Sequence, residues 1–482
     1  MDKISELFDG VWTTMEDWGA ATTFNYGIAV LIPILIVLVL ALVTKDTFVS
    51  FFAGIIAAFL MAAKGHPLVA VGLFMDQAYV TLCDDGTQWV LLVCGIFGGL
   101  IQLMTDSGGA LGFAGLAHKL LNSRKKTLIG TWILGIIVFV DDYLNCLAVG
   151  AAVKPLCDEY KISREMLAFI INSTGVVVCA IIPISTWGVF MGGLMEEADM
   201  LNGLSVVGAY THAIPYMFYC IIAVIVVPLI CLGILPKFKP MAAAEKRAIE
   251  TGEVLSEESK AMAIEGLDDE ARFEGKKCRS INFLIPLIFV AFITIVTDDM
   301  VVALLLSIIL CFILYIPQKI MTPKEFTASL MKGLTDMFGV LVLIILAYMF
   351  IDVNTMMGLN EYVVKICSAT INPKLFPFII FIGVGAMSFA SGCVWSLAAI
   401  AFPIVGPVCA AMGINPFLCA GAVISAVAFG GHICLYADTV LLTAASTGAS
   451  NTDYFRSSSP IVMAYPFAIG ALAFLIAGFV MC

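Results

Sequence analysis

Two adjacent carboxylates in the middle of an apolar run are the residues of this sequence best suited to chemistry. Asp141 and Asp142 interrupt residues 128–153, which are otherwise mostly apolar. A charged side chain facing hydrocarbon is costly, so ionisable residues at that depth usually have a function. An unpaired buried carboxylate readily holds a proton, whereas one surrounded by neutral oxygens suits Na⁺. The pattern predicts a proton or cation site, with an ion pair or a plain helix cap as the alternative.

The two aspartates are expected to have different roles. Adjacent residues project about 100° apart on a helix, so Asp141 and Asp142 cannot share one helix face. One would face a transport cavity, and the other would cap the N-terminus of a half-length helix, where the helix dipole stabilises a negative charge.

Neutral polar side chains at similar predicted depth could complete the inward half of this site. They are Asn145, Asn172, Ser173, Thr174, Ser185 and Thr186. Ser and Thr in membrane helices also bond to their own backbone or to a neighbouring helix, so a structural role is the alternative. The oxygen ligands predicted for Na⁺ are Asp142, Asn145, Asn172 and Asp438.

The second half of the chain carries a matching polar interruption at residues 429–439. It contains a glycine pair, His432, Asp438 and Thr439. Ionisable residues at a helix break are candidates for a functional site, here its outward half. The alternative is a local contact between His432 and Asp438 that closes the break. A further polar tip at 388–396 contributes Ser391, Trp395 and Ser396 as candidate cargo contacts, with simple packing as the alternative for Trp395.

Basic residues on both sides of the apolar run indicate how the aspartates are positioned. Arg124, Lys125 and Lys126 precede the run, and Lys154, Lys161 and Arg164 follow it. Short basic loops favour the cytoplasm, so both ends should lie on the same side. We expect a re-entrant hairpin of two half-length helices, 128–140 and 143–153, with the tip at 139–145. Irregular backbone at membrane depth requires protein or a water-filled cavity around it, so a polar tip suggests a binding site.

The composition predicts an all-α polytopic membrane protein. Of 482 residues, 61% are hydrophobic and 13% are charged, and apolar segments long enough to cross a bilayer recur along the chain. The net charge of −11 argues against nucleic-acid binding.

The fifteen cysteines have no regular metal-ligand spacing and are interpreted as small core residues. Motifs of soluble enzymes are missing, so neither an enzyme nor an organic cofactor is expected. The first residues lack the pattern of a cleavable signal peptide.

A charged stretch, 236–280, is expected to be a cytoplasmic linker between two transmembrane repeats, 1–235 and 281–482. Corresponding segments of the two halves lie about 250 residues apart, as for the broken spans that start at 164 and 416. The first broken span, 164–193, should be interrupted at 172–175 and at 183–187. The second hairpin, 375–407, has few basic flanking residues and should open outward. Inverted repeats of about five spans plus a hairpin, with discontinuous helices meeting at the midplane, are typical of secondary transporters.

With these residues in place, the chain resembles the NhaC family of Na⁺/H⁺ antiporters, within a wider group of ion transporters. In the first half the motifs are Phe139-Val-Asp-Asp-Tyr-Leu-Asn145, Val149-Gly, Lys154-Pro, Ser163-Arg-Glu165, Ser173-Thr174 and Pro183-Ile-Ser-Thr-Trp-Gly188. In the second half they are Gly392, Trp395 and Gly430 with His432 and Asp438-Thr439. The resemblance implies cation-coupled exchange by an elevator-like movement in the cytoplasmic membrane of a prokaryote, crossed several times.

The chain departs from that family at two carboxylate positions. Asn172 stands where the family usually has Asp before Ser-Thr, and Gly431 stands where the family has Asp before His. Fewer carboxylates weaken cation binding. This departure indicates either an altered stoichiometry or a change of cargo. From the resemblance, the leading hypothesis is a Na⁺/H⁺ antiporter-like exchanger, and the alternative is a Na⁺- or H⁺-coupled transporter of a small organic solute such as an amino acid, amine or carboxylate.

The expected partners follow from these two hypotheses. They are the lipid bilayer, Na⁺ or H⁺ as coupling ion, a small organic solute in the alternative, and a second copy of the chain in a homodimer. A passive channel would be distinguished by the lack of saturating turnover and counterflow, and an intramembrane enzyme by hydrolysis or group transfer at the aspartates.

Overall fold

The protein is all-helical wherever its structure is described. The computed structural model describes residues 26–44, 47–109, 121–262, 279–297, 299–392, 394–435 and 437–481, and in these ranges every regular element is a helix. The short Gly-rich segment 108–121, for which the sequence predicts a helix at the membrane interface, lies almost wholly outside these ranges.

The first half contains twelve described helices up to the linker, short 3₁₀ helices included. They are η1 (Gly27–Val30), α2 (Leu31–Thr44), α3 (Thr47–Ala62), α4 (Pro67–Cys83), α5 (Asp85–Asp106), α7 (Arg124–Ile137), α8 (Asp142–Glu159), α9 (Arg164–Ile181), α10 (Thr186–Glu197), α11 (Val206–Ala213) with η2 (Ile214–Tyr216), and α12 (Phe218–Cys231). If η2 is treated as the continuation of α11, the chain bends by 61° before α12.

The linker and the second half continue the helical pattern. The linker forms α13 (Lys239–Thr251) and α14 (Glu257–Met262). The second half forms α16 (Ile281–Thr297), α17 (Met300–Tyr315), α18 (Pro323–Asp336), α19 (Phe338–Met356), α20 (Leu359–Thr370), η3 (Pro373–Leu375), α21 (Phe376–Ser391), α22 (Val394–Met412), α23 (Pro416–Ile433), α24 (Asp438–Thr447), α25 (Asn451–Val462), η4 (Met463–Phe467) and α26 (Ala468–Met481).

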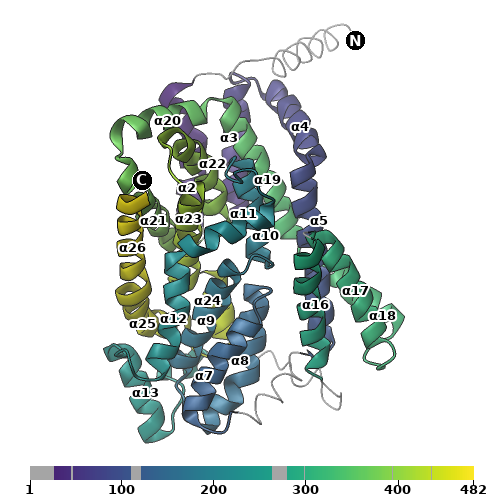
Figure 1. Ribbon diagram of the computed structural model, residues 1–482, viewed down its shortest axis with the longest axis vertical. Coiled ribbons are helices and arrows are strands. Elements are labelled where there is room, and N and C mark those ends of the chain that lie inside the picture. Colours follow the sequence, from purple (N-terminus) through teal and green to yellow (C-terminus); the bar gives the residue numbers. More distant parts are fainter. Residues whose placement is uncertain are drawn as a thin grey trace.

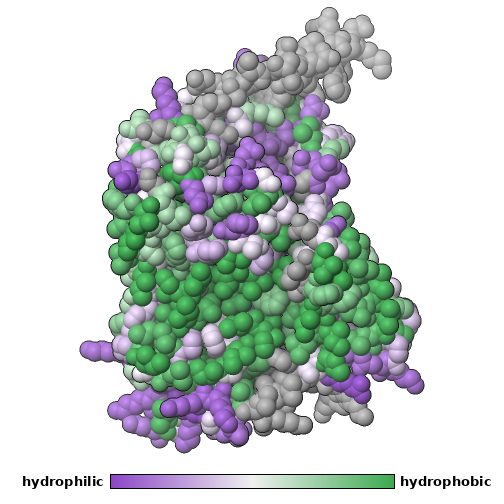
Figure 2. All heavy atoms as spheres, in the orientation of Figure 1, coloured by the Kyte–Doolittle hydropathy of each residue, from purple (hydrophilic) through white to green (hydrophobic). Residues whose placement is uncertain are grey.

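An apolar belt confirms that this is a multi-pass membrane protein. In the described residues six helices are long and apolar enough to cross a bilayer, or up to eight spans if two bent pairs each count as one. Figure 2 shows hydrophobic residues across the middle of the molecule and hydrophilic residues gathered toward both ends. The number of spans in each half stays a prediction.

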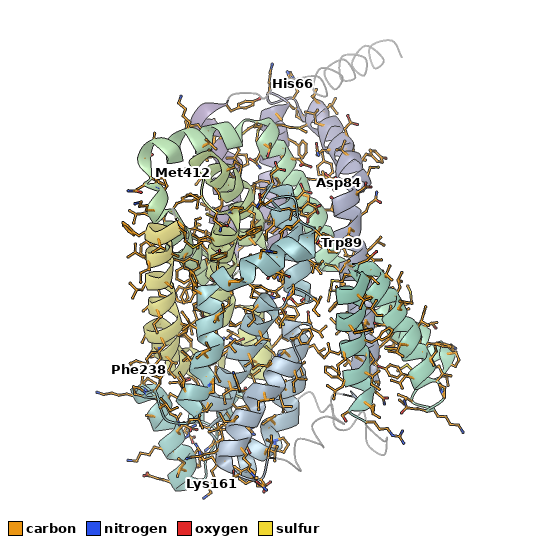
Figure 3. All side chains as sticks on the ribbon, in the orientation of Figure 1. His66, Asp84, Trp89, Lys161, Phe238 and Met412 are labelled. Carbon is orange, nitrogen blue, oxygen red and sulfur yellow. The ribbon has the colours of Figure 1, made fainter. Side chains whose placement is uncertain are left out.

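The first hairpin has both ends on one side of the molecule. Arg124, at the start of α7, donates a hydrogen bond to the carbonyl of Tyr160, which follows α8, at 3.2 Å. The 14 residues of α7 span about 20 Å, so the tip lies well inside hydrocarbon about 30 Å thick. Figure 3 shows Lys161 at the lower end of the molecule and Met412, the last residue of α22, toward the upper end. The two hairpins therefore enter from opposite ends.

The predicted helix breaks are partly correct. Residues 138–141 separate α7 from α8, and residues 182–185 separate α9 from α10, as expected. The predicted interruption at 172–175 is wrong, because α9 is continuous from Arg164 to Ile181. The polar residues there remain helical because Thr174 bonds to the carbonyl of Ile170 at 2.8 Å and the others reach neighbouring helices. At the second tip Gly392 adopts a φ of +70°, which a glycine permits and other residues rarely adopt.

A separate group of helices lies beside the hairpins. In Figure 1, α16, α17 and α18 lie around α5, to the right of α7, α8 and α9. Gly98 of α5 and Gly333 of α18 make this packing close, because a Cβ on either residue would collide with backbone of the other helix. Small residues at such contacts let helix backbones approach within a membrane.

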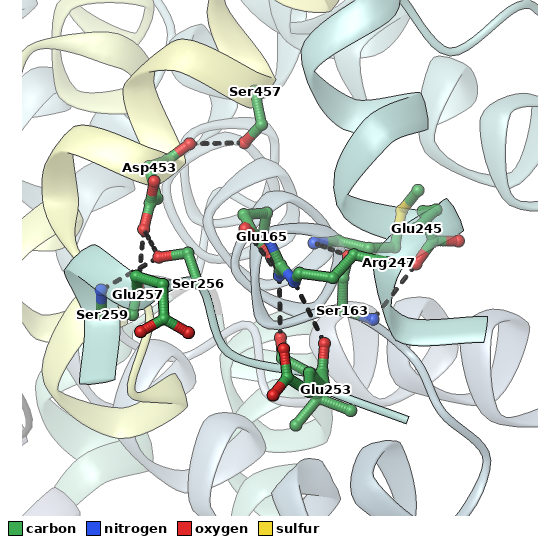
Figure 4. A network of polar contacts seen from close by, with 12 residues as sticks. Ser163, Glu165, Glu245, Arg247, Glu253, Ser256, Glu257, Ser259, Asp453 and Ser457 are labelled. Carbon is green, nitrogen blue, oxygen red and sulfur yellow. Dashed lines mark hydrogen bonds and ion pairs between the residues drawn. The ribbon is translucent and has the colours of Figure 1, made fainter. Parts of the chain in front are cut away.

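The linker is fastened to the lower end by buried polar contacts (Figure 4). Glu245 of α13 pairs with Arg124 and with Lys237, and accepts a hydrogen bond from the backbone N–H of Ser163 at 3.1 Å. Arg247 pairs with Glu165, the second residue of α9, at 3.0 Å. Farther along the linker, Ser256 and Ser259 both donate to Asp453 of α25. The linker thus connects α7 and α9 of the first half to α25 of the second.

Candidate functional site

Asp141 caps the second helix of the first hairpin. It precedes α8 in extended conformation, and its Oδ1 accepts the backbone N–H of Leu144 at 2.9 Å. Its Oδ2 accepts the hydroxyl of Thr186 at 3.2 Å. A carboxylate at this position satisfies a free helical N–H and faces the positive end of the helix dipole. The expectation that one of the two aspartates caps a half-helix is met by Asp141.

Asp142 points instead to the break between α9 and α10. Its side chain is only 2% exposed, and its Oδ2 accepts the indole N–H of Trp187 at 2.9 Å. Its Oδ1 accepts the backbone N–H of Tyr143 at 3.1 Å. Among the residues that the structure describes, no salt bridge includes either aspartate. The described part of the chain therefore does not support the alternative that these aspartates form an ion pair.

Two helix N-termini meet at the aspartates. The backbone N–H of Thr186, the first residue of α10, donates to the carbonyl of Val140 at 3.1 Å. Ser185 caps α10 through the N–H of Gly188 at 3.0 Å, and its own hydroxyl donates to the carbonyl of Cys179 at 2.7 Å. Because the N-termini of α8 and α10 both carry partial positive charge, this point in the molecule can accommodate negative charge without a basic side chain.

Asn145 fixes the tip from inside the hairpin. Its amide N–H₂ group donates to the carbonyls of Gly135 and Val138 at 2.6 and 2.7 Å, near the end of α7. Its Oδ1 is buried without a hydrogen-bond partner in the described structure. Thr174 packs against Gly135, where any side chain would collide with it. Asn145 therefore holds the hairpin together and leaves one oxygen free to bind a ligand.

Asn172, Ser173 and His432 form a second cluster, which joins the two halves. The Ser173 hydroxyl lies 2.8 Å from His432 Nε2, and the Tyr219 hydroxyl lies 2.7 Å from His432 Nδ1. Asn172 donates to the carbonyl of His432 at 2.7 Å and to the Tyr454 hydroxyl at 2.8 Å. The Oδ1 of Asn172 is buried and has no partner among the described residues. The suggested contact between His432 and Asp438 is wrong, because both ring nitrogens of His432 are taken by other helices.

Asp438 faces the first hairpin. It is exposed, begins α24, and accepts the hydroxyl of Tyr143 at 3.0 Å. Thr439 bonds to the carbonyl of Gly431 at 2.8 Å and so closes the break between α23 and α24. The contact between Tyr143 and Asp438 connects the N-terminal turns of two half-helices, α8 and α24, from opposite halves of the chain. Sequence reasoning missed Tyr143, although it directly follows the aspartate pair.

The second tip approaches the first through aromatic rings. Trp395 lies 5.3 Å from Trp187 and 4.9 Å from Phe190, measured between ring centroids. Trp187 donates its indole N–H to Asp142, and Trp395 packs against Trp187. The Trp187 ring therefore lies between Trp395 and the carboxylate. Ser396 is buried, and its hydroxyl has no partner in the described structure. Ser391 ends α21, and its side chain lies outside the described part of the chain.

The predicted residues therefore form two buried clusters rather than one cage. Asp141, Asp142, Asn145, Ser185 and Thr186 lie around the first tip, and Asn172, Ser173 and His432 lie farther along α9. The described residues include no group of three or more His, Cys, Asp or Glu that could hold a metal ion. The proposed Na⁺ ligands Asp142, Asn145, Asn172 and Asp438 stay predictions.

An apolar belt, two hairpins from opposite ends and polar helix breaks buried at depth are features of a membrane transporter. A model of the Na⁺/H⁺ antiporter family matches residues 189–479. Since this is more than half of the chain, the protein belongs to the Na⁺/H⁺ antiporter family. The matched stretch begins after the first hairpin, so the aspartate pair lies outside it. The narrower NhaC resemblance stays a prediction.

Two similar proteins extend over most of the chain. An uncharacterized protein of Haemophilus influenzae is 25% identical over 95% of this chain and 92% of its own length. The solved structure of Neisseria gonorrhoeae MtrF, assigned to a class of antimetabolite efflux pumps, matches with a TM-score of 0.53. That match covers 87% of this chain and 85% of MtrF at 13% identity, so it shows a shared fold only.

Proposed function

We propose that this protein is a secondary active transporter that exchanges Na⁺ for H⁺ across the cytoplasmic membrane of a prokaryote. The observation that carries the proposal is the burial of Asp141 and Asp142, 6% and 2% exposed, at a helix break inside the membrane region. Helix N-termini offset only part of the cost of burying two adjacent carboxylates, so a proton or a bound cation is favoured here. Because the two ligands compete for the same oxygens, binding of one releases the other, and exchange follows.

The aspartates divide this task according to their contacts. Asp142 would exchange Na⁺ and H⁺, because each of its two carboxylate oxygens accepts a hydrogen bond from a neutral donor and not from a basic side chain. Asp141 would keep α8 capped and add negative charge beside it. The free Oδ1 of Asn145 is the neutral oxygen best placed to join a Na⁺ ion at the tip.

The helix order supports an inverted repeat. The helices α7, α8, α9 and α10 begin at 124, 142, 164 and 186, and α21, α22, α23 and α24 begin at 376, 394, 416 and 438, a constant separation of 252 residues (376 − 124 = 252). Each set contains a hairpin and a broken helix, and the hairpins enter from opposite ends. This arrangement suits alternating access, in which a site is open to one side at a time.

An elevator-like movement would use the apolar contact behind the first tip. Phe139, Val140 and Ile184 line a cleft shared with Phe97 and Leu100 of α5 and Leu287 of α16. The tip itself is connected to α10 and α24 by hydrogen bonds, so it would move together with them. An apolar boundary has no hydrogen bonds to break when one body slides past another.

A second candidate cargo is a small organic solute coupled to Na⁺ or H⁺. Asn172 replaces a carboxylate expected from the NhaC resemblance, and its amide N–H₂ group is already bonded to His432 and Tyr454. The rings of Trp187 and Trp395 beside Asp142 would suit a solute with an ammonium group, which aromatic faces attract. Adding candidate amino acids, amines or carboxylates to a pH-dye assay would reveal solute-dependent proton movement.

The direct test is Na⁺-dependent proton movement in proteoliposomes. Asp142→Asn should abolish it, because the amide cannot exchange a proton for a cation, while the protein stays folded in the membrane. Glu250→Gln, a charge-neutralising change on the exposed face of α13, should leave the exchange unchanged. Full activity of Asp142→Asn would remove this residue from the mechanism and the proposal with it.

A further inference from the structure

A second group of carboxylates lies at the end of the molecule opposite the linker. It comprises Asp84 before α5, Glu196 and Glu197 at the end of α10, and Asp352 in α19. Figure 3 shows Asp84 in the upper part of the molecule, where Figure 2 shows hydrophilic residues gathered above the apolar belt. In the part of the chain that the structure describes, none of these four forms a salt bridge.

Asp352 is held in a fixed orientation with one oxygen open. Its Oδ2 accepts the side-chain amide of Gln77 at 2.6 Å and the hydroxyl of Thr81 at 3.2 Å, both from α4. Gln77 and Thr81 are buried. No hydrogen bond to the Oδ1 occurs within the described structure. Asp352 lies inside α19 and bonds to another helix, so it is not a helix cap.

Tyr348 adds a polar group without a partner. Its side chain is 1% exposed, and its hydroxyl has no hydrogen-bond partner in the described residues. A buried hydroxyl in this state is unfavourable, so a native structure usually provides a ligand or water for it. The hydroxyl lies against Gly193 of α10, where a Cβ would collide with it. Glycine at 193 therefore leaves room for the hydroxyl beside α10.

Two helix faces oppose each other at this point. Tyr348 and Asp352 are four residues apart on α19, and Gly193 and Glu197 are four residues apart on α10, so each pair shares a helix face. Tyr348 touches Gly193, and the charge of Glu197 acts on the Tyr348 hydroxyl, so Glu197 lies near this contact. The charges of Asp352 and Asp84 act on Glu197. Side chains of α4, α10 and α19 thus meet where acidic groups gather.

We infer that Asp352, Glu197 and the Tyr348 hydroxyl form a binding site for one small monovalent cation, separate from the site at Asp141 and Asp142. Such a site requires a ligand with one positive charge that several oxygen atoms can contact. Both Na⁺ and a primary ammonium group meet this requirement. A tightly ligated divalent metal fits less well, because no three acidic, His or Cys side chains in the described ranges could hold one. Trp187 and Glu197 lie on one helix, so the two sites are about 15 Å apart.

The site is tested by equilibrium binding to the purified full-length protein. The variant Asp141→Asn/Asp142→Asn removes the central carboxylates, and radiolabelled Na⁺ and radiolabelled methylammonium serve as the two probes. This background should bind at least one probe saturably. Adding Asp352→Asn should weaken that binding by about tenfold or more, and adding Tyr348→Phe, which deletes only the hydroxyl, should weaken it by about threefold. Adding Glu250→Gln should leave the affinity unchanged.

The outcomes separate this inference from the proposed exchange. Binding in the background variant, which cannot exchange ions, supports the site whether or not the proposed function is correct. The probe that saturates tells Na⁺ from an ammonium ligand. If neither probe binds the background variant, or if Asp352→Asn and Tyr348→Phe leave binding unchanged, the inference is wrong. Should Asp352→Asn fail to fold, Tyr348→Phe decides the question, since it preserves every carboxylate.

Discussion

At the scale of single residues, the two aspartates have different roles. Asp141 caps α8 and contributes to stability, whereas Asp142, which contacts the indole of Trp187, is the proposed ion-binding residue. A helix cap needs only an oxygen that accepts a backbone N–H, and Asn provides one as well as Asp does. Proton exchange needs an ionisable group. Substitution by Asn therefore preserves the first role and removes the second, which makes the pair experimentally separable.

Asp141→Ala is expected to lower the free energy of unfolding by about 1 kcal/mol, because the N–H of Leu144 loses its partner. Asp141→Asn should stay within about 0.5 kcal/mol of the parent protein. The measurement is thermal or denaturant unfolding of the purified protein in one detergent. Equal destabilisation by both variants would show that the charge of Asp141, rather than its capping oxygen, is what stabilises the fold.

Tyr143→Phe is expected to raise the Na⁺ concentration for half-maximal exchange by about twofold to fivefold. The change removes the hydrogen bond to Asp438 and loosens the alignment of α8 with α24, and a bond to a partly exposed carboxylate has a modest net value. Tyr160→Phe, at the other end of α8, is the matched control. An unchanged ion dependence in both variants would contradict a positioning role for Tyr143.

The sequence identified the carboxylates and amides of the site but not their partners. Asp141, Asp142 and Asn145 are conspicuous because polar groups are costly in an apolar run. Tyr143, Tyr219 and Tyr454 belong to the same networks, yet a tyrosine in an apolar segment is an ordinary core residue. Only the folded chain shows that their hydroxyls meet residues more than two hundred positions away.

At the scale of elements, helix breaks were predictable where backbone hydrogen bonding has to stop. Pro183 followed by Ser185 and Thr186 combines a residue that cannot continue a helix with good capping residues, and the break is there. Residues 172–175 were misassigned as a break because polar side chains were treated as if they disrupted the backbone. Asn172 and Ser173 form hydrogen bonds with His432 on a neighbouring helix instead, so the helix continues.

The linker contact is expected to weaken in acid. Burial by itself would raise the pKa of Glu245, but the charges of Arg124 and Lys237 and the N–H of Ser163 outweigh it and lower the pKa below its usual 4.5. A group with a lowered folded pKa stabilises above its unfolded pKa, and this stabilisation is lost as the pH falls through the folded value. Below about pH 4.5 the linker should therefore hold less tightly to α7 and α9.

Spin labels on α13 and α9 would measure this loss as a broader distance distribution below that pH. Glu245→Gln should show the broad distribution at neutral pH as well, because the amide forms no ion pair with Arg124 or Lys237. Glu250→Gln, whose side chain is solvent-exposed on the same helix, should behave like the parent protein. A distribution that stays narrow in acid would mean that apolar contacts, rather than Glu245, hold the linker.

At the scale of the whole molecule, the proposed mechanism requires that the first hairpin tip moves against α5 and α16. The helix groups in Figure 1 and the apolar cleft between them define where that movement would occur. The sequence predicted the hairpins and the division by the linker. It did not indicate which helices share a body, because that depends on packing between segments of the two halves, such as Gly98 against Gly333.

A crosslink across the cleft is therefore expected to arrest exchange. Leu100→Cys in α5 and Ile184→Cys at the α9–α10 break line the same cleft, so a short thiol-to-thiol crosslinker can connect them and hold the tip against α5. Transport should fall by about tenfold or more, and a reducible crosslinker should allow recovery. Leu100→Cys with Leu287→Cys connects α5 to α16, which would lie in one body, and should leave transport close to that of the treated parent protein, whose native cysteines set the baseline. Full exchange with the first pair crosslinked would show that the tip works without moving past α5.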